Sequence, residues 1–202
     1  MKFPEIYISN EDKTIFFKRL EEIYKEMELR YSIVADSLDF NCKDCTDNCC
    51  YTHFRHHTLI EYLYLIKGIE SLDDKLRLKI IENAFYVVSK TSEAEANGEK
   101  IRILCPINND GLCSLYEHRL MICRLHGTAH YFDSPRGRIK GPGCFRFEEL
   151  SKNKKKVPML DRTDIYRNLA FLEMDLRKKT GYDFKFKHSI AEMICGAFRD
   201  SK

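Results

Sequence analysis

The sequence predicts a mainly α-helical domain with a metal-organised loop core and a small β-hairpin. Several long stretches carry apolar residues at spacings of three and four, which is the pattern of amphipathic helices. After the first of them, four cysteines fall within nine residues, from Cys42 to Cys50. The turn motif Ser134-Pro135-Arg136-Gly137 lies between two β-prone runs and predicts the hairpin.

The first predicted helix covers residues 11–38, and Ser9 and Asn10 just ahead of it are capping residues. Residues 39–52 are polar, poor in aliphatic side chains and rich in cysteine, so we expect a loop shaped by its ligand. The apolar stripe of the helix comprises Phe16, Leu20, Ile23, Tyr24, Met27, Tyr31, Val34 and Leu38.

Two further helices are predicted before the next cysteine. They cover residues 57–69 and 71–96, and each has one apolar face. Asn97-Gly98 is a typical end for the second of these helices. Residues 101–104 form a short apolar run, which suggests a strand leading into Cys105.

A strong turn signal follows at Asn108-Asn109-Asp110-Gly111. A turn here brings Cys105 and Cys113 close together, as a metal knuckle requires. Residues 115–123 suggest a short helix.

The remaining elements are the hairpin and two C-terminal helices. Residues 128–132 and 138–139 are the predicted strands of the hairpin. Residues 152–156 are rich in lysine, and because no aromatic residues interleave with them we expect a solvated loop. Helices are predicted over residues 161–179 and about 188–198.

Composition limits the class of protein. With 202 residues, one domain spanning 1–202 is expected, its cysteine-cluster region at about 40–145 flanked by N- and C-terminal helices. The net charge is only +3, which does not favour nucleic-acid binding. No apolar run resembles a signal peptide or a membrane span, so we expect a cytoplasmic protein without a membrane association.

In a reducing compartment, clustered cysteines hold metal ions more often than they form disulfides. Zinc ions and iron–sulfur clusters both favour thiolate ligands, and gaps of two or three residues aim two sulfurs at one centre. We therefore expect an iron–sulfur cluster of the 4Fe-4S type or a zinc ion. The predicted metal ligands are Cys42, Cys45, Cys49, Cys50, Cys105, Cys113, Cys123 and Cys144.

Eight thiolates suffice for two four-ligand centres, or for one centre with spare thiols, and the sequence leaves both possibilities open. The adjacent Cys49 and Cys50 point apart in an extended backbone, so one of them could serve a different centre or none. The sequence also leaves open whether the metal takes part in chemistry or only stabilises the fold.

These motifs resemble the YkgJ-type cysteine-cluster family, which is described as zinc- or iron-chelating. The resemblance covers about residues 40–145. A similar cluster occurs in flagellin lysine-N-methylase, an iron–sulfur protein, so the resemblance favours iron. The motifs that carry it are Cys42-x2-Cys45-x3-Cys49-Cys50, Cys105-Pro106, Gly111-Leu112-Cys113-Ser114-Leu115-Tyr116-Glu117-x-Arg119 and Cys123-Arg124.

The chain also departs from the family pattern. Leu120 stands where proline is common, which weakens a turn signal. His126-Gly127 replaces a frequent aromatic-proline pair and places His126 beside Cys123 as an alternative ligand. Arg119 and Arg124 match the family motif and are candidates for supporting the thiolate charge.

The other candidates have simpler interpretations. His53, His56 and His57 follow the first cysteines and are expected to be polar residues at a helix start rather than ligands. The ninth cysteine, Cys195, lies in an apolar stretch and is expected to be a buried core thiol.

Three functions follow from this pattern. The first is a metal-binding protein that handles metal or carries out redox chemistry, with a protein partner. The second is an iron–sulfur-dependent modification enzyme, such as a protein lysine N-methylase, which is implied by the resemblance; no cofactor-pocket motif accompanies it, so enzyme status stays open. The third is a zinc-stabilised interaction module.

Overall fold

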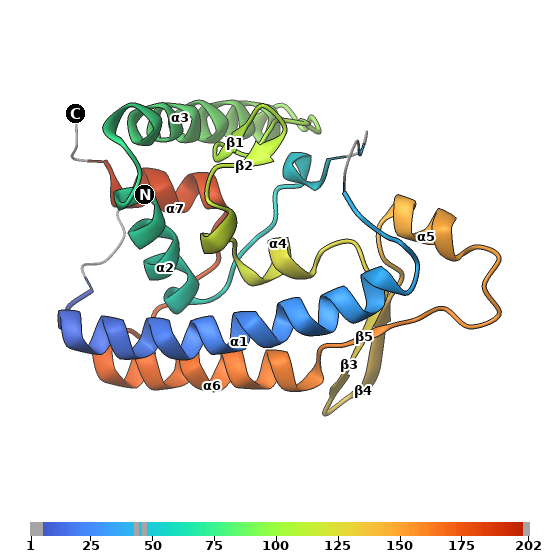
Figure 1. The fold of residues 1–202 in the computed structure, drawn as a ribbon. Coiled ribbons are helices and arrows are strands. Elements are labelled where there is room, and N and C mark those ends of the chain that lie inside the picture. The colour runs from blue at the N-terminus through green and yellow to red at the C-terminus, as the bar shows by residue number, and fades with distance from the viewer. Residues whose placement is uncertain (1–5, 43–44, 46–47, 200–202) are drawn as a thin grey trace. The chain divides into compact units, whose positions relative to one another are not determined.

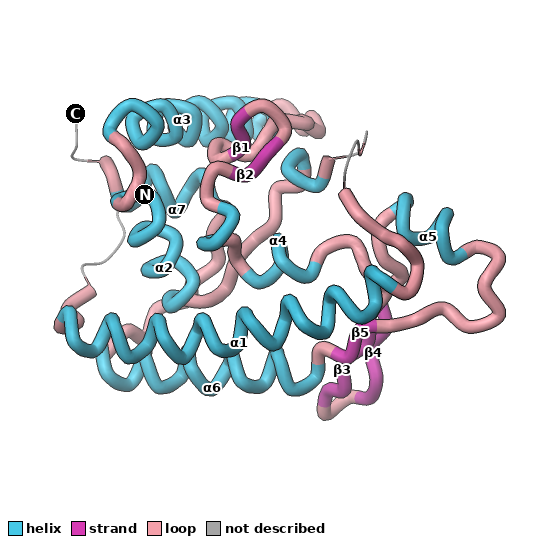
Figure 2. Tube along the Cα trace, in the orientation of Figure 1, coloured by secondary structure: helices cyan, strands magenta, loops and turns pink. Residues whose placement is uncertain are grey.

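Helices dominate the computed structural model, which describes residues 6–42, 45 and 48–199 (Figure 2). The prediction of a mainly α-helical fold with a small β-hairpin is confirmed. The chain forms two compact units, each built from separate segments. Unit 1 contains the described residues of Met1–Ile8, Asn48–Leu120 and Lys179–Lys202, and unit 2 those of Ser9–Asp47 and Met121–Lys178. The single domain over 1–202 stays a prediction.

Unit 2 is organised by two long helices, α1 (Asn10–Asp36) and α6 (Thr163–Thr180), which run side by side (Figure 1). Arg19 on α1 forms an ion pair with Asp175 on α6 at 2.7 Å. The predicted cap is confirmed, because the Ser9 side chain accepts a hydrogen bond from the backbone N–H of Asp12. The other elements of unit 2 are α4 (Met121–Leu125), β3 (His130–Ser134), β4 (Gly137–Gly141), α5 (Phe145–Ser151) and β5 (Leu160–Asp161).

Strands β3 and β4 form the predicted antiparallel hairpin, which pairs His130 with Gly141. The His130 ring fills the space beside Gly141, where an added Cβ would meet its Cε1 at 2.3 Å. Two elements of this unit were not predicted. Strand β5 adds to β3 in parallel through two residue pairs, and α5 is held by the buried Phe147, whose ring meets that of Phe40 edge-on at 5.3 Å.

Unit 1 contains the other helices. Helix α2 spans Leu59–Glu70, α3 spans Asp74–Ala96 and α7 spans Ile190–Ala197. Helices α3 and α7 pack against each other (Figure 1). Both begin at a side-chain cap, Asp73 for α3 and Ser189 for α7. The short elements of unit 1 are the 3-10 helices η1 (Cys49–Tyr51) and η2 (Tyr116–His118) and the strands β1 (Asn108–Asn109) and β2 (Leu112–Cys113).

Two element predictions were wrong. Residues 101–104 are not a strand. Among the described residues their segment is held by isolated contacts to residues 50–53 rather than by a ladder of backbone pairs. The predicted short helix over 115–123 is instead interrupted between η2 and α4. Arg119 has an extended backbone there, and Leu120 after it is buried.

A buried histidine, His56, connects two segments of unit 1 that are far apart in the sequence. His56 and His188 form an antiparallel bridge, with backbone hydrogen bonds of 2.8 and 3.0 Å. The His56 side chain is 4% exposed, and its Nε2 has no hydrogen-bond partner among the described residues. Burial lowers the pKa of His56 to about 4, and the charge of His57 adds to this effect.

This pKa predicts a loss of stability in acid. The folded pKa lies below that of the unfolded chain, so protons bind preferentially to the unfolded state as the pH falls from about 6.5 towards 4. We expect His56 to lower the free energy of unfolding by about 2 kcal/mol between pH 7 and pH 5. His188 acts in the same direction, because burial lowers its pKa too.

Urea denaturation of wild type and His56→Gln at both pH values checks this expectation. The variant should lose about 2 kcal/mol of the pH dependence. The exposed neighbour His57, changed to Gln, should leave most of it in place. An unchanged pH dependence in His56→Gln contradicts the assignment.

Candidate metal centre

The predicted ligands divide equally between the two units. The unit 1 quartet is Cys49, Cys50, Cys105 and Cys113. The unit 2 quartet is Cys42, Cys45, Cys123 and Cys144. None of the nine cysteines forms a disulfide in the structure.

The sequence has two blocks of cysteines, at residues 42–50 and 105–144. Within unit 1, a cysteine of the first block contacts a cysteine of the second. The backbone N–H of Cys105 donates a 2.9 Å hydrogen bond to the carbonyl oxygen of Cys50. Cys50 lies in η1, whose cap is Asn48, and the Asn48 side chain accepts from the Cys50 N–H at 2.9 Å. This contact brings a cysteine of the first block next to a cysteine of the second. Their sharing of a metal stays a prediction.

The turn predicted between Cys105 and Cys113 is present. Strands β1 and β2 pair Asn108 with Cys113, and both central residues, Asp110 and Gly111, have positive φ. Positive φ at both positions is typical of a type I′ hairpin, which favours Asp-Gly. The Asn108 side chain accepts from the Gly111 N–H at 3.0 Å. The Asn108 backbone N–H donates to the Cys105 carbonyl at 3.0 Å, which ties Cys105 to the base of the hairpin.

The thiols of this quartet affect one another electrostatically. The pKa of Cys50 is lowered to about 6, chiefly by a hydrogen bond from the Cys49 side chain. Burial opposes this shift, while the Asn108 side chain and the Arg119 charge support it. Cys50 is therefore largely a thiolate at neutral pH, the form that binds metals.

Cys105 is the opposite case. Burial raises its pKa to about 12, and the charges of Cys50 and Cys113 act in the same direction, although backbone N–H groups oppose them. The residue keeps some exposed area, but its sulfur is removed from water. A nearby cation would favour the ionised form of this thiol.

The segment after Cys113 is anchored on α2. The His118 ring stacks on Tyr64 with centroids 4.7 Å apart. Gly68 makes this possible, because an added Cβ would meet the His118 Cγ at 2.5 Å. Next to it, the Arg119 guanidinium lies over the Tyr116 ring, 3.6 Å from its centroid. This places the Arg119 charge where it stabilises the Cys50 thiolate.

In unit 2, Gly127 connects the segment of Cys144 with the segment that precedes Cys42. The backbone N–H of Cys144 donates to the Gly127 carbonyl at 2.9 Å. Phe40, just before Cys42, packs so closely on Gly127 that an added Cβ would lie 2.9 Å from its ring. Cys123 lies on α4, which precedes Gly127 in the chain. Cys45 donates its N–H to the Cys42 carbonyl at 3.3 Å. The intervening residues 43–44, like residues 46–47, lie outside the described residues.

Arg124, the residue after Cys123, supports the helix rather than a ligand site. It is buried, pairs with Glu28 on α1 and lies over the Tyr24 ring, 4.1 Å from its centroid. Arg162 holds the same helix at its last residue by donating to the Leu125 carbonyl. Together these two arginines fix the position of Cys123.

The expectation of polar residues at a helix start was wrong for His56, which is buried in the bridge to His188. The role of the His126 side chain as an alternative ligand stays a prediction. The Nε2 of His53 lies 3.2 Å from the Ile103 carbonyl oxygen, and the backbone carbonyl of His126 accepts from the Tyr31 hydroxyl at 3.1 Å. Cys195 on α7 is half-buried, and burial raises its pKa to about 11. Sequence reasoning missed Asn48 and Asn108. Asn48 showed only the turn preference of asparagine beside Cys49, and Asn108 was identified only as part of a turn.

The donor chemistry fits a thiophilic metal, since each quartet offers four sulfurs. Within residues 6–42, 45 and 48–199, no group of three or more His, Cys, Asp or Glu side chains is arranged as a metal site. The eight-cysteine ligand set therefore stays a prediction.

Comparison with models of protein families, with curated proteins and with solved structures finds no match for the chain. The resemblance to the YkgJ-type family stays a prediction. Across the part of the chain that the structure describes, no helix has both the length and the apolar character needed to span a membrane.

The buried Arg124 leads to a stability prediction. Arg124→Met keeps the apolar stem but removes the ion pair and the cation–π contact. Because Glu28 is half-exposed and can be rehydrated, we expect a moderate loss of about 1–3 kcal/mol in the free energy of unfolding. Urea denaturation measures it. Arg136→Met, at an exposed position of the hairpin turn, is the matched control and should change stability by less than about 0.5 kcal/mol. Equal stability of the two variants contradicts this role.

Proposed function

We propose that this protein binds a thiophilic metal, a zinc ion or a 4Fe-4S cluster, through its cysteine thiolates, and that it acts in metal handling or redox chemistry. The principal site is the unit 1 quartet. The observation that carries this proposal is the hydrogen bond from the backbone N–H of Cys105 to the Cys50 carbonyl, which brings two cysteines that are far apart in the sequence together in unit 1.

Three further features support the unit 1 quartet as a ligand set. The type I′ turn holds Cys105 and Cys113 on one short hairpin. Cys50 is ionised near neutral pH, since its pKa is lowered to about 6, chiefly by the Cys49 side chain. The Asn108 side chain and the Arg119 charge both act to lower the pKa of Cys50, and such groups tune thiolate centres.

The bound group would supply either structural cross-linking, as zinc does, or a site for one electron, as an iron–sulfur cluster does. The protein's own residues hold the thiolates. Asn108 fixes the hairpin, Arg119 offsets thiolate charge, and the stack of His118 on Tyr64 anchors the chain after Cys113.

The unit 2 quartet offers a second set of four thiols. A four-thiolate zinc site or a cubane cluster needs four ligands, so each unit contains a complete set by itself. We therefore propose two centres per chain at full loading.

Anaerobic purification with an absorption spectrum and metal analysis tests the proposal. A brown protein with a broad band near 400 nm and bound iron indicates an iron–sulfur cluster, whereas a colourless protein with bound zinc indicates zinc. A protein that contains neither metal and binds neither on reconstitution contradicts the proposal.

Single variants test the division into two centres. Cys113→Ser and Cys144→Ser should each lower the metal content per chain by about half, because each removes one ligand from a different quartet. Cys195→Ser, a cysteine of unit 1 outside both quartets, is the control and should keep full metal content.

Complete loss of metal in either ligand variant contradicts two independent centres. Loss in Cys195→Ser contradicts the ligand assignment. Circular dichroism of each variant shows whether the helices persist, which separates loss of a ligand from loss of the fold.

A further inference from the structure

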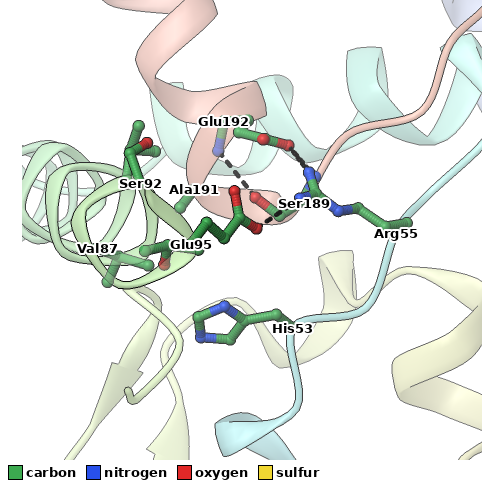
Figure 3. A pocket seen from close by; sticks show the side chains of 10 residues that line it. His53, Arg55, Val87, Ser92, Glu95, Ser189, Ala191 and Glu192 are labelled. Atoms are coloured by element: carbon green, nitrogen blue, oxygen red, sulfur yellow. Dashed lines mark hydrogen bonds and ion pairs between the residues drawn. The ribbon is translucent and has the colours of Figure 1, made fainter. Parts of the chain in front are cut away.

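Unit 1 contains a cavity of about 210 Å³ that none of the metal chemistry uses. It lies where α3, α7 and the chain around His53 face one another (Figure 3). Polar groups come from all three segments. Thr91, Ser92 and Glu95 belong to α3, Glu192 to α7, and His53 and Arg55 to the connecting chain. Val87 and Ala191 add an apolar surface.

The charges of this cavity do not balance. The Arg55 guanidinium donates a hydrogen bond to Glu192 and lies 3.8 Å from the Glu95 carboxylate (Figure 3). Burial acts to raise the pKa of Glu192, but hydrogen bonds from Arg55 and Ser189 outweigh it and hold the pKa below its usual value. Two carboxylates against one guanidinium leave one net negative charge.

Two side chains of the cavity have oxygen atoms without a hydrogen-bond partner among the described residues. Thr91 lies within α3, where a threonine hydroxyl commonly bonds to the carbonyl four residues earlier. Its Oγ1 is instead buried without a hydrogen-bond partner among the described residues. The contacts of Glu192 with Arg55 and Ser189 all use Oε2, which leaves Oε1 available within the described part of the chain.

An anion does not fit this arrangement. The N-terminus of α7 faces the cavity through Ser189, and a capping box already satisfies the backbone N–H groups of Ser189 and Glu192. There, Glu192 accepts from the Ser189 N–H, and Ser189 accepts from the Glu192 N–H. The nearby guanidinium is likewise held by the two carboxylates. The surplus capacity consists of carboxylate and hydroxyl oxygens, which accept from a donor with positive charge.

We propose that this cavity binds the primary ammonium group of a small alkylamine. Its three N–H donors match Glu95, the Oε1 of Glu192 and the Thr91 hydroxyl, while Val87 and Ala191 cover the alkyl carbons. The cavity is smaller than the roughly 300–1,000 Å³ of typical ligand pockets, so it selects short amines. This site is independent of the metal proposal, because it shares no residue with either quartet.

A two-dimensional ¹H–¹⁵N NMR titration of the full chain with n-butylamine tests the proposal. We expect saturable shifts confined to the backbone amides of cavity residues on α3 and α7. The neutral analogue n-butanol should give no saturable shifts, since it lacks the charge.

Glu95→Gln is the decisive variant, because the Glu95 side chain is 65% exposed and its replacement is compatible with folding. It should weaken n-butylamine binding by at least about threefold, as expected for one partly exposed carboxylate. Glu93→Gln removes the same charge from the same helix outside the cavity and should leave the affinity unchanged.

Three results overturn the proposal. They are the absence of saturable binding to wild type, equal binding of n-butanol, and equal weakening by Glu93→Gln and Glu95→Gln. The spectra themselves show whether each variant keeps the wild-type fold.

Discussion

The backbone hydrogen bond between Cys105 and Cys50 is the contact on which the proposed site depends. The two segments that it joins contain only short turns and no long helix or strand. Few backbone hydrogen bonds therefore offset the conformational entropy that is lost when these segments become ordered. Asn48 fixes the turn on one side, and the hairpin at Asp110-Gly111 fixes the other. A metal bound to these thiols would add the remaining stabilisation, because metal affinity and folding are thermodynamically linked.

In unit 2, the segments that carry cysteines are held in place by close packing. Gly127 has a φ of 110° and lies under the Phe40 ring, while its carbonyl accepts from Cys144. A side chain at this position would displace Phe40 or force a strained backbone, so glycine is required. Two buried arginines, Arg124 and Arg162, then hold α4 in place. Small residues and buried cations thus position the segments that carry the second quartet.

The sequence predicted the elements whose signals are local. Helix α1 follows from its apolar spacing and the Ser9 cap, and the turns at Asn108–Gly111 and Ser134–Gly137 follow from their turn-forming residues. Strand β5 and helix α5 were missed because their stability comes from distant partners, β3 and Phe40. The apolar run at 101–104 was misread for a related reason, since a β-prone run without a paired neighbour does not form a strand.

The same distinction applies to the candidate site. Cysteine spacing identified the eight thiols, but only the fold divides them into two quartets. The amine cavity had no sequence signal, because Arg55, Glu95 and Glu192 come from three distant segments. Only the capping box at Ser189 and Glu192 is visible as a pattern, and it indicates a helix start rather than a binding site.

X-ray absorption spectroscopy of the anaerobically purified protein, recorded at the edge of the bound metal, tests the central claim most directly. Thiolate coordination predicts a first shell made of sulfur, at about 2.3 Å from zinc or at a similar distance from iron. For a cluster, a second shell of iron neighbours should accompany it. A first shell dominated by oxygen or nitrogen at about 2.0–2.2 Å would contradict thiolate coordination and the function built on it.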